Sequence, residues 1–154
     1  MTARLDLTRA DSGAYKAMMG LQTYVNESGL EPSLLSLIEL RTSQINGCAY
    51  CIDMHSKDAR ARGETEQRIY ALDAWRETSF YSERERAALA WTEAVTLIGD
   101  GHVPDSVYRE AREHFADGEL MRLTLAVVVI NGWNRLCIAF RVPSGSYQPA
   151  KRAS

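Results

Sequence analysis

The chain has 154 residues and a mass of 17.3 kDa, a size typical of one domain with one hydrophobic core. Hydrophobic residues make up 45% and charged residues 25% of the sequence, with only 4 Pro and 10 Gly, which excludes a disordered or fibrous chain. The 18 Lys and Arg against 20 Asp and Glu give a net charge of −2, and no segment concentrates the basic residues, so nucleic acid is not an expected partner.

The chain carries no sign of export or of membrane insertion. Its N-terminus lacks the continuous apolar segment of a secretory signal, so we expect a cytoplasmic protein. The longest apolar run, residues 123–130, is far shorter than the ~20 residues that cross a bilayer, so we expect no membrane contact. Two of the 3 cysteines form a C-x-x-C, which in such a chain favours redox or metal chemistry over a structural disulfide framework.

Apolar residues recur at spacings of three and four along most of the chain, which predicts helices. Pro32 suits the first turn of a helix, where its missing N–H costs nothing, and Ser82 with Glu85 forms a capping box. Asn46-Gly47 predicts a break just before Cys48. The predicted helices span residues 12–27, 32–44, 48–62, 64–76, 82–98, 104–115 and 119–141.

The segment 125–130 is the one ambiguous stretch, because its β-branched residues would also suit a buried strand. Apolar residues flank it on both sides without a proline, so we interpret it as part of a buried helix. No hairpin pattern or internal repeat is visible, and the expected class is all-α, with about six to seven helices. We expect a single domain over residues 1–142 and a flexible C-terminal tail over 143–154.

Residues 48–55, Cys-Ala-Tyr-Cys-Ile-Asp-Met-His, hold the chemistry-bearing side chains. At about 100° per residue on a helix, Cys51 lies about 60° and His55 about 20° from Cys48, so the three share one face. The spacing allows a disulfide between the two cysteines, and the N–H groups of a first helical turn favour negative charge. We therefore hypothesise that at least one of these thiols has a lowered pKa.

A structural zinc site is the main alternative interpretation of these residues. Cys48, Cys51 and His55 would supply three of four ligands, and the fourth would have to be His102, His114 or an acidic group. No second C-x-x-C or H-x-H is present, so redox chemistry is the simpler explanation. A pair with neither function is the remaining possibility.

Residues 43–55, Ser-Gln-Ile-Asn-Gly-Cys-Ala-Tyr-Cys-Ile-Asp-Met-His, resemble the signature of the AhpD-like alkylhydroperoxidases within the carboxymuconolactone decarboxylase superfamily. The similarity extends from the second predicted helix through 82–98, and on to residues 131–136. It implies an AhpD-like helical domain that assembles as a trimer or hexamer. It also implies a thiol-dependent peroxidase of antioxidant defence that reduces hydroperoxides and needs neither a metal nor an organic cofactor.

The resemblance assigns a role to each member of the motif. Cys51 would attack the peroxide, His55 would relay its proton, and Cys48 would resolve the resulting sulfenic acid. A dithiol reductant, either a lipoyl protein or a thioredoxin-like protein, would then reopen the disulfide.

The sequence departs from the best-known family member at two positions. The glutamate that completes the proton relay there corresponds to Ser36 here, and Glu39, one helical turn further on, is the natural substitute. Glu93 is the competing carboxylate. Tyr50 replaces a second histidine, which weakens the transfer of that member's efficiency and reductant to this chain.

Carboxymuconolactone decarboxylation is the rival activity that the superfamily name suggests, but members that perform it lack the redox C-x-x-C. Cys137 is predicted to be a buried core thiol without chemistry. The remaining residues of note are expected at the surface (His102, His114), in core or subunit contacts (Trp75, Trp91, Trp133), or bonded to neighbouring backbone or lining a pocket (Asn131, Asn134). Apolar faces on nearly every predicted helix lead us to expect a homo-oligomer.

Overall fold

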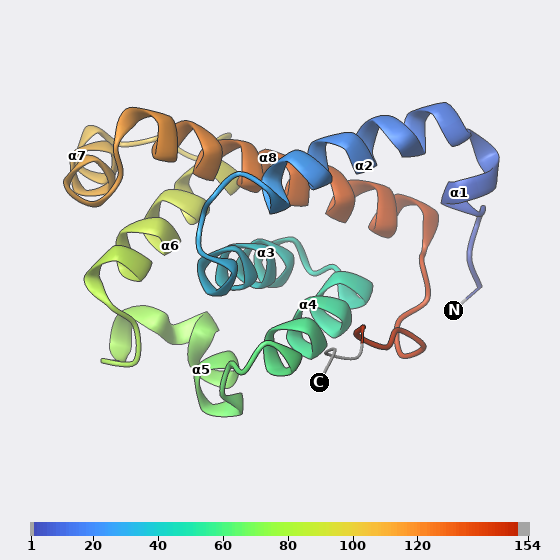
Figure 1. Cartoon of the computed structure of the whole chain (residues 1–154), viewed down its shortest axis with the longest axis horizontal. Coiled ribbons are helices and arrows are strands. Elements are labelled where there is room, and N and C mark those ends of the chain that lie inside the picture. The colour runs from blue at the N-terminus through green and yellow to red at the C-terminus, as the bar shows by residue number, and fades with distance from the viewer. Residues whose placement is uncertain (1, 151–154) are drawn as a thin grey trace.

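The computed structural model describes residues 2–150, and in this part of the chain all regular structure is helical (Figure 1). The elements are α1 Leu7–Ala10, α2 Ser12–Asn26, α3 Pro32–Asn46, α4 Ala49–Ala61, α5 Glu66–Ala71, the 3-10 helix η1 Leu72–Glu77, α6 Glu83–Thr96, α7 Asp105–His114 and α8 Asp117–Phe140. The all-α prediction is confirmed, and segment 125–130 lies in the middle of α8.

The structure differs from the predicted elements at two places. The single turn α1 was not predicted, because it has no apolar periodicity and is held locally by Asp6, whose carboxylate accepts hydrogen bonds from the Thr8 N–H and hydroxyl. The continuous helix expected over 64–76 is wrong: Ala74 has a non-helical backbone, and the segment divides into α5 and η1. This irregular path buries Trp75 against the neighbouring helices.

Helix α3 runs through the middle of the molecule and packs against α4, α6 and α8 (Figure 1). One hydrophobic cluster joins it to α2, α6, α7 and α8, and a second joins it to α4, α5, η1 and α6. It is therefore buried on almost every side, and its buried residues are Leu34, Leu35, Ser36, Leu37, Ile38, Glu39, Leu40, Thr42 and Ser43. A buried polar group on α3 is expected to find its hydrogen-bond partner inside the protein, and the Thr42 hydroxyl is an exception that has none within residues 2–150.

Amide side chains fix the C-terminal end of α3 against α8. The Asn46 amide donates to the side-chain oxygens of Asn131 at 3.0 Å and Asn134 at 2.9 Å. Asn134 in turn donates to the Ser43 hydroxyl at 3.1 Å. Asn131 bonds to neighbouring backbone as expected, at Val127, but the main role of both α8 amides is to join two helices.

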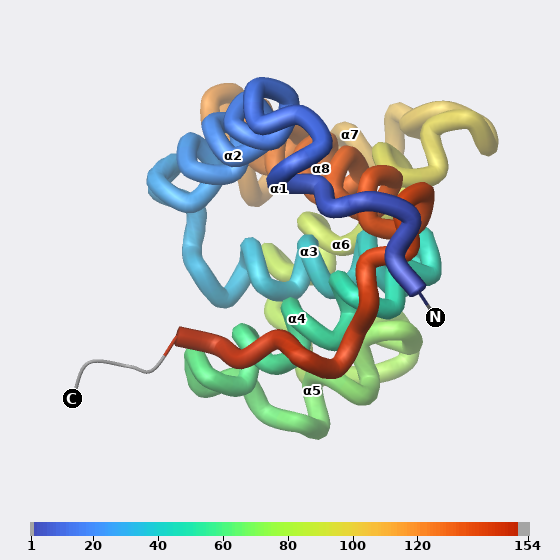
Figure 2. The backbone as a smooth tube through the Cα atoms, turned by 90° about the vertical axis from the view of Figure 1, so that its right-hand side faces the viewer, coloured from blue at the N-terminus to red at the C-terminus, as the bar shows by residue number. Residues whose placement is uncertain are grey.

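The C-terminal segment 143–150 runs back along α4 (Figure 2). The Gly145 N–H donates to the Asp53 carboxylate at 3.0 Å, and the Tyr147 hydroxyl donates to Asp58 at 2.8 Å. Lys57 donates to the Tyr147 carbonyl at 3.1 Å. The tail predicted over 143–154 is thus hydrogen-bonded to α4 as far as it is described, and residues 151–154 lie outside the described part; the domain limit at 142 stays a prediction.

By length and composition alone, α8 is the one helix within residues 2–150 that could cross a membrane. In the structure it packs against α2, α3 and α6, and its buried residues belong to the core. A long apolar helix of this kind is typical of the central helix of a bundle.

Leu123, in the first half of α8, is fully buried, with 0% of its surface exposed. Because Leu123→Ala leaves a cavity in the main core, we expect it to lower the free energy of unfolding by about 2–5 kcal/mol. Leu97→Ala is the matched control, since Leu97 is 48% exposed and an exposed substitution changes stability by at most about 0.5 kcal/mol. Urea unfolding followed by circular dichroism measures both, and equal effects would contradict the core assignment.

Candidate active site

The site begins where α3 ends. Gly47 closes α3 in the left-handed conformation, with φ 67° and ψ 33°, and its N–H bonds back to the last turn. Open space surrounds its Cα, so glycine is required there by the backbone angle and not by crowding. Cys48 then lies in the N-cap position of α4, and Cys51 lies in its first turn. The predicted break at Asn46-Gly47 is confirmed, with Cys48 one position outside the helix.

The two cysteines of the motif form a disulfide. Their Cα atoms are 5.3 Å apart, within the usual range for a disulfide. Both residues are only 1% exposed, so the bond lies beneath the surface. The spacing of Cys48 and Cys51 therefore allows a disulfide, as predicted, and the lowered thiol pKa stays a prediction for the reduced protein.

Glu39 and His55 form a buried pair beside the disulfide-bearing turn. The His55 Nδ1 lies 3.3 Å from the Glu39 Oε2, and neither side chain is more than 9% exposed. The Gln22 amide donates to the other carboxylate oxygen of Glu39 at 3.1 Å, and Trp133 donates to the Gln22 oxygen at 3.1 Å. A chain of hydrogen bonds thus runs from α8 through α2 and α3 to the imidazole on α4.

The ionisation of Glu39 follows from these contacts. Burial raises the pKa of Glu39. The charge of His55 and the hydrogen bonds from His55 and Gln22 lower it by more than burial raises it, so the pKa of Glu39 lies below its ordinary value. Glu39 is therefore a carboxylate at neutral pH. Its Oε2 lies against the His55 Nδ1 as a hydrogen-bond acceptor and so fixes the orientation of the imidazole beside the cavity.

Glu93, the competing relay carboxylate, lies in a different cluster. It accepts hydrogen bonds from Arg41 at 2.8 Å, from the Trp75 indole at 2.9 Å and from Arg76. Ser36 is also committed elsewhere, since its hydroxyl accepts a hydrogen bond from Arg62 at 2.8 Å. Of the three positions considered for the relay group, the structure brings Glu39 to His55.

A cavity of about 730 Å³, open to solvent, lies next to these residues. Cys51, His55 and Glu39 are in its wall, whereas Cys48 is not, so the cavity meets the disulfide on its Cys51 side. The rest of the wall is largely apolar and includes Leu7, Tyr15, Met19, Tyr50, Met54 and Trp133. Trp133 packs against the main core, as expected, and also lies in the cavity wall, edge-to-face with Tyr15 at 5.8 Å between ring centroids.

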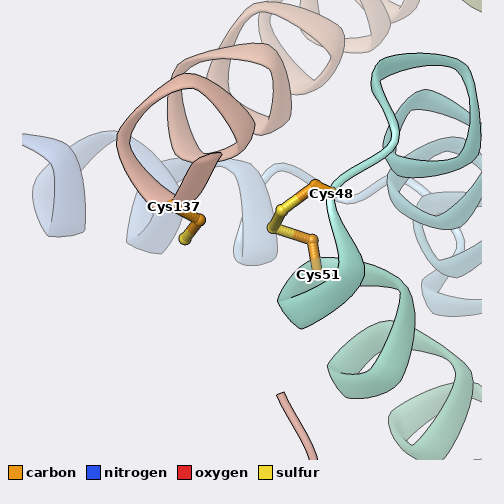
Figure 3. Close-up of side chains that lie close together, drawn as sticks. All are labelled: Cys48, Cys51 and Cys137. Atoms are coloured by element: carbon orange, nitrogen blue, oxygen red, sulfur yellow. A yellow bond between two sulfur atoms is a disulfide. The ribbon is translucent and has the colours of Figure 1, made fainter. Parts of the chain in front are cut away.

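Cys137, in the last turn of α8, lies close to the disulfide (Figure 3). The three sulfurs all lie within 4.8 Å of one another. Cys137 is buried, as predicted, and burial raises the pKa of its thiol to about 11. Its contact with the C-x-x-C could not be inferred from local sequence patterns, because it joins opposite halves of the chain.

The zinc set considered for Cys48, Cys51 and His55 does not agree with the geometry. Among residues 2–150, the one group of three or more potential ligand residues close enough for a metal is Cys48, Cys51 and Cys137. His55 is not in it, because its imidazole is turned toward Glu39. Neither His102 nor His114 joins the group.

Comparison with known proteins places these features in a family context. The sequence model of the carboxymuconolactone decarboxylase family matches residues 13–94. The chain is 45% identical to the uncharacterised protein YdfG of Bacillus subtilis, over 90% of this chain and 95% of that one.

Two solved structures share the fold. A protein of unknown function from Agrobacterium tumefaciens, described as a candidate AhpD antioxidant defence protein, is 43% identical with a TM-score of 0.92, covering 95% of this chain and all of that one. The debrominase Bmp8 is 21% identical with a TM-score of 0.76, over 84% and 70% of the two chains.

The lowered pKa of Glu39 has a consequence for stability. Its contribution is fully present above the unfolded pKa of 4.5 and is lost as the pH falls through the lower folded value. Glu39→Gln removes this titration, so we expect the stability advantage of the wild type over the variant to shrink below pH 4.5. Urea unfolding of both proteins over a pH series at constant ionic strength measures it. An advantage that does not change with pH would contradict a buried carboxylate.

Proposed function

The chain belongs to the carboxymuconolactone decarboxylase family, in its AhpD-like group, and we propose that it is a cysteine-based peroxidase that reduces organic hydroperoxides. The observation that carries the proposal is the position of the disulfide. Cys51 faces a large open cavity next to a buried His55–Glu39 pair, and Cys48 lies behind it.

The first step uses Cys51 of the reduced protein. His55 takes the Cys51 proton at Nε2, and the thiolate attacks the terminal peroxide oxygen. An S–O bond forms, the O–O bond breaks, and the departing alkoxide receives the proton from His55 to leave as an alcohol. Glu39 positions the imidazole and stabilises its protonated form, because the carboxylate already accepts the Nδ1–H.

The second step uses Cys48. The Cys48 thiol loses its proton and the thiolate attacks the Cys51 sulfur of the sulfenic acid, so the S–S bond forms, the S–O bond breaks, and the departing hydroxide takes up that proton and leaves as water. The N-cap position holds Cys48 within one turn of Cys51, which favours closure of the disulfide over further oxidation by peroxide.

The size and lining of the cavity support an organic substrate over hydrogen peroxide. A volume of about 730 Å³ with aromatic and thioether side chains can enclose an alkyl or aryl group. Carboxymuconolactone decarboxylation is the weaker alternative, since it would give the dithiol couple no part in the reaction. Debromination, the activity of Bmp8, is tested by including a brominated pyrrole among the substrates.

The partners follow from the same proposal. The cycle needs a dithiol reductant, a lipoyl or thioredoxin-like protein, to reopen the disulfide, and no metal or organic cofactor. We also propose a homo-oligomer, a trimer or hexamer, because Met121 and Val128 expose apolar surface seven residues apart on one face of α8. A cytoplasmic location suits a thiol that must be kept reducible.

The cysteine variants separate the two chemical roles. We expect Cys51→Ser to lower cumene hydroperoxide consumption to the uncatalysed rate, because no thiol is left at the cavity position assigned to the nucleophile. We expect Cys48→Ser, combined with Cys137→Ser because the Cys137 sulfur lies within 4.8 Å of Cys51, to consume one equivalent and then stop, with a sulfenic acid on Cys51. Stopped-flow consumption and dimedone labelling followed by mass spectrometry measure both, and full turnover by Cys51→Ser would refute the assignment.

The relay is tested by a pair of Glu→Gln variants. Glu39→Gln removes the charge that supports the protonated imidazole, and we expect the rate of Cys51 oxidation to fall about 10–100-fold. Glu93→Gln is the matched control, because Glu93 bonds to Arg41 and Trp75 away from the cavity, and we expect a rate close to the wild type. Both rates are measured on reduced protein after circular dichroism has verified folding. A larger loss in Glu93→Gln would reverse the assignment.

A further inference from the structure

The third cysteine is not used by the proposed peroxidase, yet it is placed against the active disulfide. Cys137 comes from α8, and Cys48 and Cys51 come from the start of α4 (Figure 3). All three sulfurs lie within 4.8 Å of one another, and all three residues are buried. Leu7, Tyr50 and Val142 pack around them, so the surroundings of the cluster are mostly apolar.

We propose that the reduced protein has a three-thiol site, formed by Cys48, Cys51 and Cys137, that binds a trivalent thiophilic species of the arsenite type. The site goes beyond the proposed peroxidase and does not rest on it. It requires only that the Cys48–Cys51 disulfide can be reduced.

The separation of the sulfurs fits a single three-coordinate centre. With bonds of about 2.3 Å to each thiolate, three sulfurs around one ion lie roughly 3.5–4 Å apart. Reduction releases the Cys48 and Cys51 sulfurs from their covalent bond and lets them move apart toward this distance. Cys137 already lies close enough to complete the triangle after a small change of side-chain angle.

The net charge of the three-thiolate complex favours a trivalent species over a divalent ion. A divalent ion held by three thiolates leaves one negative charge in apolar surroundings, which is costly to bury. Arsenite, As(OH)₃, instead reacts with three thiols to form three As–S bonds and release three waters, with no change in oxidation state. Its product is neutral. This suits Cys137 especially, because its sulfur is buried among apolar side chains, which disfavour a free thiolate.

The cavity gives access to the site. Cys51 and Cys137 are both in the cavity wall, so an incoming molecule meets these two sulfurs first, and Cys48 closes the third bond from behind. The bound species would occupy both sulfurs of the redox couple. Binding and disulfide formation therefore exclude each other, and the site can be occupied in the reduced protein alone.

The test compares two arsenicals on two proteins. Protein reduced with a phosphine and freed of reductant is titrated with arsenite, which can bind three thiols, and with phenylarsine oxide, which can bind two. Wild type and Cys137→Ser are compared by native mass spectrometry and by alkylation of the remaining free thiols. Reaction with cumene hydroperoxide is followed separately, so failure of the peroxidase proposal is distinguished from failure of this one.

We expect one arsenic per wild-type chain, with all three thiols protected from alkylation. Loss of the third, intramolecular bond in Cys137→Ser is expected to weaken arsenite binding about 100-fold while phenylarsine oxide binding changes less than about 3-fold. Equal arsenite affinity in the two proteins, alkylation of Cys137 in the arsenite-bound wild type, or tighter binding of Zn²⁺ than of arsenite would each overturn the proposal. If Cys137→Ser does not fold, the wild-type alkylation pattern decides alone.

Discussion

The buried contact between Glu39 and His55 is the interaction on which the site depends. A carboxylate in the most buried helix of the protein must be paired, and its partners come from two other helices, His55 on α4 and Gln22 on α2. This pairing fixes the imidazole next to the cavity, one turn beyond Cys51. A buried ion pair stabilises a fold less than apolar packing of the same volume does. The presence of the His55–Glu39 pair in this core is therefore better explained by the reaction proposed at the cavity than by stability.

A second set of buried polar contacts places the other side of the site. The amides of Asn46, Asn131 and Asn134 hold the end of α3 against α8, just before Gly47 turns the chain into α4. These contacts therefore fix the position of Cys48, at the start of α4, relative to α8. The same arrangement brings Cys137, one turn beyond Asn134, within reach of the pair. The His55–Glu39 pair and the sulfur cluster thus both depend on the polar contacts that α3 makes with its neighbouring helices.

Most of the helices could be predicted from sequence because periodicity and capping are local signals, as at Ser82 and Glu85. The turn at 7–10 and the kink at Ala74 could not, since the first depends on one side-chain cap and the second on where Trp75 is buried. The disulfide and its helix start followed from spacing, whereas the preference for Glu39 came from a family resemblance and a helical register. The position of Cys137 is a purely tertiary fact, which periodicity and motif spacing do not encode.

The burial of the disulfide also bears on how it is reduced. Both cysteines are 1% exposed, and the sulfur that a reductant can approach, Cys51, is reached through the cavity. A dithiol fixed on the flat face of a folded protein would need the helices around the cavity to move apart before it made contact. A dithiol on a narrow, flexible arm can enter the cavity as the substrate does, at a lower cost in rearrangement. Within the proposed peroxidase cycle, a reductant dithiol on a narrow arm, as in a lipoyl protein, would therefore suit this site better than one on a flat surface, and the hydroperoxide and the reductant would use the same cavity.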